Sequence, residues 1–229
     1  MRDLPDQLVQ TTSPEHAIAA VLELCQTEGL FWLGWVVTRD EADTEHSVKP
    51  FPIHLAYIRE LWRQLATNQC VAIAKSRQML VSWVVAAFCV WWARFKPHQA
   101  VFWQTQKWQD ATGMVCQAEG GFPGRCQFIE RNLPPWMQLS IKEQEGALTY
   151  PNGSLIQALA GGADQVRGKV ASVIVEDEFA RQEEATGVWT TVAPLVQKGC
   201  KVIVVSTPNG SSNQFAVLYH GRPLDLGGL

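Results

Sequence analysis

The chain has 229 residues, of which 47% are hydrophobic and 18% are charged, so it can bury one substantial α/β core and is not expected to be disordered. Its net charge of −3 excludes the broad basic surface typical of nucleic-acid-binding domains, so any grip on DNA must be local, weak or shared among subunits. The six cysteines form no C-x-x-C pair, which favours reduced, packing thiols over disulfides or zinc ligands.

Residues 1–48 predict a helical extension in front of the main domain. Ser13 is a suitable N-cap and Pro14 suits the first turn of a helix that continues to about Gly29. The apolar, aromatic segment 31–37 predicts an added strand, and the charged segment that follows it predicts a loop. No signal peptide is expected at this N-terminus, and the apolar run 81–95 is too short for a membrane span.

Residues 49–215 are expected to form the main domain, which opens with the corner Lys49-Pro50-Phe51-Pro52. The aromatic ring of this corner suits a hydrophobic staple that fixes the entry to the next helix. That helix is predicted over residues 54–66, where apolar side chains recur at helical spacing.

The next elements form a strand, a loop and a helix. Residues 70–74 predict an apolar strand, residues 75–82 a loop, and residues 83–95 a long apolar helix. In this layout, N–H groups at the helix N-terminus can bind phosphate. A plain βα turn is the alternative.

The loop departs from the usual G-x-x-x-x-G-K-[ST] pattern. Leu80 and Val81 stand where the second glycine and the lysine would be, and only Ser82 keeps its place, as a possible Mg²⁺ ligand. A phosphate site still needs a cation, and the loop offers Lys75 and Arg77, displaced toward its start.

The middle of the domain contains further short strands. A strand over residues 100–105 precedes a helix over 108–117, and strands over 138–142, 147–150 and 154–158 follow, the last two joined by a Pro-Asn-Gly turn as a hairpin. The glycine-flanked loop 161–169 then carries Arg167. An arginine on such a loop suits a finger that completes a neighbouring subunit's active site, or a surface arginine that bonds its own loop.

The β-branched run 173–175 leads into three consecutive carboxylates, Glu176, Asp177 and Glu178. Because adjacent like charges repel and burial raises their pKa values, a cation is expected at this strand tip. Ligands bind at the carboxyl ends of parallel strands, where Asp177 suits a Mg²⁺ contact and Glu178 suits polarising an attacking water. An acidic helix N-cap is the alternative.

A second β-branched strand, starting at residue 201, ends in small polar residues. Ser206 and Thr207 lie at its tip, and a Pro-Asn-Gly turn that contains Asn209 follows. These residues are placed to sense a γ-phosphate held at the neighbouring strand and to relay that state to another element.

Together these segments resemble the ATPase motor of tailed-phage large terminases over roughly residues 49–210. The matching segments are Lys75-Ser76-Arg77-Gln78, Val175-Glu176-Asp177-Glu178-Phe179-Ala180 and Ser206-Thr207-Pro208-Asn209-Gly210. Their order is that of the family's phosphate-binding loop, acidic strand tip and coupling motif, and Arg167-Gly168 matches its Arg-Gly element. Some large terminases carry a deviant loop whose lysine lies at its beginning, as Lys75 does.

The resemblance implies a RecA-like P-loop NTPase of the ASCE type, with a mainly parallel central sheet, flanking helices, the N-terminal extension and a β-hairpin insertion. It implies ATP and Mg²⁺ as cofactors. The implied nucleotide contacts are Phe51, which would stack on adenine, with Lys75, Ser76, Arg77, Gln78, Ser82, Ser206, Thr207 and Asn209. The implied Mg²⁺ contacts are Ser82 and Asp177, and the implied catalytic residues are Glu178 and Arg167.

The same resemblance implies translocation of double-stranded DNA into a procapsid. The implied partners are that DNA, a portal protein ring, a small terminase subunit and further copies of the chain in a ring, with a monomer in isolation. The implied location is the host cytoplasm and, transiently, the portal vertex. Residues 216–229 would be a tail or the start of a linker, and no nuclease domain is expected in this chain.

Two alternatives remain open from the sequence. One is a catalytically weak or decayed nucleotide-binding module of a truncated prophage terminase, which the replacement of Gly-Lys by Leu80-Val81 favours. The other is a helicase-like ATPase.

Overall fold

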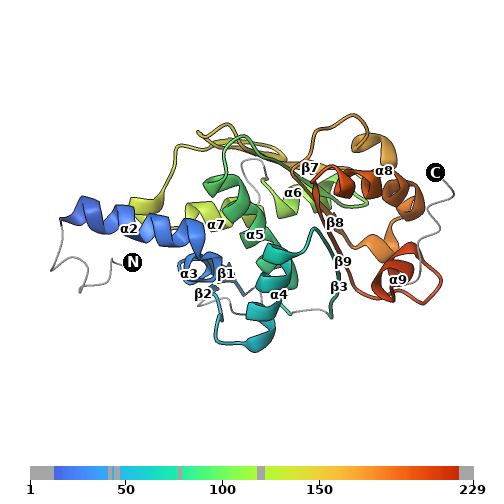
Figure 1. Ribbon diagram of the computed structural model, residues 1–229, viewed down its shortest axis with the longest axis horizontal. Helices are drawn as coiled ribbons and strands as arrows, with labels where there is room; N and C mark the ends of the chain where they lie inside the picture. The colour runs from blue at the N-terminus through green and yellow to red at the C-terminus, as the bar shows by residue number, and fades with distance from the viewer. Residues whose placement is uncertain (1–12, 41–42, 44–46, 77–78, 118–121, 222–229) are drawn as a thin grey trace.

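The computed structural model describes residues 13–40, 43, 47–76, 79–117 and 122–221 (Figure 1). Its centre is a seven-stranded sheet with the order β3-β9-β8-β4-β7-β6-β5. Neighbours from β3 to β7 pair in parallel, while β6 and β5 add antiparallel strands at one edge. The strands are β3 Cys70–Ala74, β4 Ala100–Gln104, β5 Lys142–Gln144, β6 Ala147–Thr149, β7 Leu155–Leu159, β8 Val173–Asp177 and β9 Lys201–Ser206. A small second sheet pairs β1 Val37–Arg39 with β2 Val48–Pro50.

Helices cover both faces of the large sheet. The α-helices are α2 Pro14–Thr27, α3 Gly29–Leu33, α4 Ala56–Thr67, α5 Val81–Phe95, α6 Trp108–Met114, α7 Arg125–Arg131, α8 Ala185–Gln197 and α9 Gln214–Tyr219, with short 3₁₀ helices η1 Pro135–Met137, η2 Ala163–Gln165 and η3 Phe179–Arg181. The larger core packs α2 to α7 on one face, and a second core packs α8 and α9 on the other (Figure 1). The predicted α/β architecture, a mainly parallel sheet flanked by helices, is therefore confirmed.

The central elements have the sequence character that full burial requires. Every residue of β8 and β9 is buried, and both strands are rich in β-branched side chains, as expected of strands covered on both faces. Helix α5 is apolar on nearly all sides and lies against the sheet. Among the described residues, no helix combines the length and the apolar character needed to cross a membrane.

The N-terminal extension differs in part from its prediction. Ser13 caps α2 as expected, since its side chain accepts a hydrogen bond from the His16 amide. The predicted strand over 31–37 is wrong for its first half, which is helix α3. Trp32 and Leu33 are fully buried there, and a short aromatic run does not distinguish a strand from a buried helix.

The predicted hairpin is part of the central sheet. Strands β6 and β7 pair across the turn at residues 151–153, as expected, but β7 also pairs in parallel with β4. The first of the three predicted strands begins later than expected, at Lys142. The domain boundary that the sequence placed after residue 215 falls inside α9, where Phe215 is buried in the second core.

Gly124 is a point of close backbone contact that the fold needs. A Cβ added there would lie 2.6 Å from the Val115 carbonyl carbon and the Cys116 amide nitrogen. We expect Gly124→Ala to lower the free energy of unfolding by about 1–3 kcal/mol or more, because backbone cannot easily move aside. Gly187→Ala, in α8 with ordinary spacing to its neighbours, is the matched control and should be neutral or slightly stabilising. Urea unfolding of both variants checks this, and equal stabilities would contradict it.

Candidate nucleotide site

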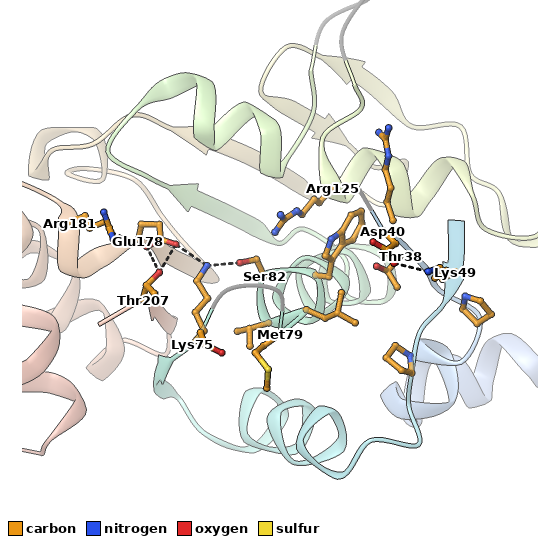
Figure 2. A pocket seen from close by; sticks show the side chains of 17 residues that line it. Thr38, Asp40, Lys49, Lys75, Met79, Ser82, Arg125, Glu178, Arg181 and Thr207 are labelled. Atoms are coloured by element: carbon orange, nitrogen blue, oxygen red, sulfur yellow. Dashed lines mark hydrogen bonds and ion pairs between the residues drawn. The ribbon is translucent and has the colours of Figure 1, made fainter. Parts of the chain in front are cut away.

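A cavity of about 910 Å³ opens where the parallel strands end and α5 begins (Figure 2). Because β3, β8 and β9 run in parallel, the residues that follow them meet at one edge of the sheet. The residues that line the cavity are Thr38, Arg39, Asp40, Lys49, Pro50, Pro52, Lys75, Ser76, Met79, Leu80, Val81, Ser82, Trp83, Arg125, Glu178, Arg181 and Thr207.

Lys75 connects three segments that are distant in sequence. Its Nζ donates to Ser82 Oγ at 2.8 Å and to Asp177 Oδ1 at 3.1 Å, and it lies 3.2 Å from Glu178 Oε1 (Figure 2). Its backbone amide donates to the Ser206 carbonyl, which fixes the start of the loop to β9. The structure therefore brings the predicted cation and the two predicted acidic residues together.

Glu176 and Asp177, at the end of β8, point to opposite faces of the sheet. Side chains alternate along β8, so Val175 and Asp177 face α5, while Ile174 and Glu176 face the second core. Burial raises the pKa of Asp177, although the Lys75 ammonium opposes this. Burial raises the pKa of Glu176 to about 8, against a hydrogen bond from Gln182 that lowers it.

Glu178 lies just beyond the strand with a left-handed backbone, at φ 48°. Its carboxylate accepts the Thr207 hydroxyl at 3.0 Å and lies 3.8 Å from Arg181 Nε. Burial raises the pKa of Glu178, but the charge and hydrogen bond of Lys75, together with Thr207, outweigh this and lower it overall. The carboxylate is thus ionised at neutral pH, as a water-polarising group must be.

Asp177 offers a place for a cation. Its Oδ2 is buried and has no hydrogen-bond partner among the described residues, and such an oxygen is costly to leave unmatched. Together with the Ser82 hydroxyl it supplies hard oxygen donors, which suit Mg²⁺. These residues fit the predicted metal.

Other predicted residues take different places. Ser206 is fully buried and its Oγ accepts from the Ala180 amide, while Asn209 donates to the Ala180 carbonyl. Both residues therefore hold the turn that follows Glu178, and neither is among the described residues that line the cavity.

Phe51 is not positioned for the predicted stacking on a base. It is 4% exposed and packs in the larger core, while Pro50 and Pro52 on either side line the cavity. The ring is part of the larger core and the Phe51 amide donates to the Val36 carbonyl, so this residue anchors the corner, in line with the alternative structural role.

Arg167 lies apart from the cavity. Its side chain is 70% exposed and pairs with Asp164 of its own loop at 2.8 Å. A role in a neighbouring subunit stays a prediction. Arg77 and Gln78, also predicted as phosphate contacts, lie outside the described residues.

Several cavity residues were not predicted. Thr38, Arg39 and Asp40 come from β1 and the segment after it, which the sequence suggested was a loop, and Arg125 comes from the start of α7. No local motif marks them, because only the packing of the N-terminal extension and of α7 against α5 brings them to the cavity.

Glu176 gives the site a testable pH dependence. Its folded-state pKa of about 8 lies above the ordinary 4.5, so the folded chain holds a proton that the unfolded chain releases. The contribution of Glu176 to the free energy of unfolding should be largest below about pH 4.5 and should decrease as pH rises toward 8. Glutamine has no proton to lose in this range, so the stability of Glu176→Gln relative to the parent should increase between pH 5 and pH 8. Urea unfolding at several pH values tests this, with exposed Glu183→Gln as control, and a pH-independent difference would contradict it.

Comparison with known proteins relates this fold to one group of viral proteins. No protein-family model matches the sequence. The structure matches a variant of the large terminase ATPase domain of Thermus phage P74-26, with 18% identity and a TM-score of 0.50 over 70% of this chain and 72% of that one. It matches the large terminase of bacteriophage HK97 with 10% identity and a TM-score of 0.56 over 76% of this chain and 38% of that one.

The large terminase of the thermophilic bacteriophage D6E also matches, with 12% identity and a TM-score of 0.52 over 75% of this chain and 43% of that one. The chain therefore spans about two fifths of the HK97 and D6E large terminase chains that it matches. Its fold is that of an α/β ATPase domain. More specifically, it is the fold of large-terminase ATPase domains, as the sequence resemblance predicted.

Proposed function

We propose that this chain is the ATP-hydrolysing motor domain of a phage large terminase, which drives double-stranded DNA into a procapsid. The observation that carries the proposal is the contact of Lys75 with Ser82, Asp177 and Glu178 at the carboxyl edge of a terminase-like sheet. A cation, a hydroxyl and the Glu178 carboxylate line one cavity there, and the buried Asp177 carboxylate contacts the same cation, which is an arrangement that suits phosphoryl transfer.

In this proposal, Ser82 and Asp177 would hold Mg²⁺, which would supply neutralisation of the charge on the transferring phosphoryl group. Glu178 orients the attacking water. Thr207 donates to Glu178 and so couples the end of β9 to the position of the carboxylate. The turn held by Ser206 and Asn209 extends that coupling to η3.

The Lys75 ammonium can pair either with the Asp177 and Glu178 carboxylates or with phosphate oxygens. In the structure it forms ion pairs with Asp177 and Glu178. Phosphate oxygens would compete for the same ammonium, because a flexible lysine stem can redirect its charge. Binding of ATP would therefore release the Glu178 carboxylate toward water.

Phosphate release from ATP and Mg²⁺, with and without double-stranded DNA, tests the proposed function. DNA-stimulated hydrolysis supports the motor. Nucleotide binding without turnover would instead favour a decayed binding module, and stimulation by single strands alone would favour a helicase-like ATPase.

The backbone at Leu80 supports a phosphate-binding loop. Leu80 stands where the usual second glycine would be and has a positive φ of 55°, a conformation that glycine adopts most readily. The loop therefore keeps a glycine-like backbone at this position.

Assembly with other copies, a portal ring and a small terminase subunit forms part of the proposal. Arg167 is exposed on a loop and could reach a neighbouring subunit. We expect Arg167→Ala and Glu178→Gln subunits, mixed on portal-bearing capsids, to hydrolyse more ATP than either variant alone, because each supplies what the other lacks. Parent protein diluted with each variant is the control. No gain in the mixture would place Arg167 outside a shared site.

A further inference from the structure

Arg125 is a cationic residue on the cavity wall that comes from a different element than the phosphate loop. It is the first residue of α7 and lines the same cavity as Lys75, Ser82 and Glu178. In Figure 2 its side chain extends from α7 toward Ser82 and away from Lys49. It therefore points toward the start of α5, where Ser82 lies.

The backbone that carries Arg125 is firmly held. Cys126 and Ile129 are fully buried, and Glu130 forms a buried ion pair with Arg94 of α5 at 2.6 Å. The preceding Gly124 packs directly on the backbone at the end of α6. Such anchoring preorganises the guanidinium, in contrast to an arginine on an exposed loop.

An aromatic ring supports the side chain itself. The Arg125 guanidinium carbon lies 5.2 Å from the centroid of the Trp83 ring, within the range of a cation–π contact. Trp83 is 6% exposed and packs edge-on against Phe128 at 5.4 Å, so the ring is fixed. Trp83 lines the same cavity as Ser82, so this contact keeps the guanidinium at the cavity wall.

We propose that Arg125 binds the terminal phosphate of ATP within its own subunit. The inference rests on the proposed function. In it, Arg125 contacts the terminal phosphate, which would lie near Ser82 and Glu178. A guanidinium presents a planar fork that matches two phosphate oxygens. Lys75 from the loop and Arg125 from α7 would then hold the phosphate chain from two sides, and Arg125 would distinguish ATP from ADP.

The experiment compares binding of a fluorescent, non-hydrolysable ATP analogue with that of the matching ADP analogue, both with Mg²⁺. In Arg125→Ala, affinity for the ATP analogue should fall on the order of tenfold to a hundredfold, as for other charged hydrogen bonds, while affinity for the ADP analogue stays within about threefold. Arg125→Lys keeps the charge without the fork and should lie between. Arg131→Ala is the control, since this arginine lies at the other end of α7 and pairs with Glu143.

The outcomes separate this inference from the proposed function. If the parent binds neither analogue, the proposed function fails and the role of Arg125 fails with it. If the parent binds both and Arg125→Ala leaves both affinities unchanged, the proposed function stands and the inference is overturned. Equal losses for both analogues would place Arg125 at another part of the nucleotide and overturn the assignment to the terminal phosphate. Thermal unfolding of each variant identifies losses that come from misfolding.

Discussion

Replacing Glu178 by Gln is expected to lower ATP turnover by a factor on the order of a hundred or more while ATP binding survives. The carboxylate is ionised at neutral pH because Lys75 and Thr207 lower its pKa against the effect of burial. Glutamine keeps the size and can still accept the Thr207 hydroxyl, but it lacks the charge that orients water. Phosphate release and analogue binding, measured on the same preparation, check the two halves of this prediction.

Two further variants sharpen the test of Glu178. Glu183→Gln makes the same chemical change at an exposed carboxylate nearby and should keep parent turnover. Asp177→Asn should weaken Mg²⁺-dependent binding, because Asp177 is the proposed metal contact, and so should differ from Glu178→Gln. Hydrolysis at the parent rate by Glu178→Gln would remove Glu178 from the proposed catalytic role.

Replacing Lys75 by Ala is expected to weaken ATP binding by about tenfold to a hundredfold, since a charged hydrogen bond to phosphate is lost. It should also lower the free energy of unfolding by about 1–3 kcal/mol in the absence of nucleotide. The second effect follows from burial, because Asp177 has a side chain that is 1% exposed and loses its cationic partner. Titration with a fluorescent ATP analogue and urea unfolding measure the two effects.

Lys49→Ala is the matched control for Lys75→Ala. Lys49 also lines the cavity, but its side chain is 44% exposed and its ion pairs with Asp40 and Asp43 contribute little to stability. Arg77→Ala completes the comparison as the second predicted phosphate contact. Unchanged affinity in Lys75→Ala, combined with a loss in Arg77→Ala, would reverse the ranking of the two cations.

Local sequence rules predicted the residues at the strand tips. Lys75, Asp177 and Thr207 each follow or end an apolar, β-branched strand, and parallel strands bring such positions to one edge whatever the surrounding packing. The capped α2 and the buried α5 were predictable for a similar reason, since caps and apolar periodicity act over one or two turns.

Outside the strands, tertiary packing determined whether a side chain points into the core or toward the cavity. Phe51 and the aromatic segment that forms α3 are apolar enough either to line a cavity or to fill a core. In the structure both pack in the larger core together with the other N-terminal helices. Ser206 and Asn209 carry polar groups that suit a nucleotide, but the turn after Glu178 takes up their hydrogen bonds.

The sequence by itself determined the α/β class, the order of the site segments and the placement of a lysine and of carboxylates at strand tips. It did so because strand direction and side-chain alternation are local properties. Only the tertiary structure decided which core covers each face of β8, and that Arg125 reaches the cavity from α7. Those placements depend on contacts between segments far apart in the chain, and the strength of such contacts cannot be inferred from the residues of either segment alone.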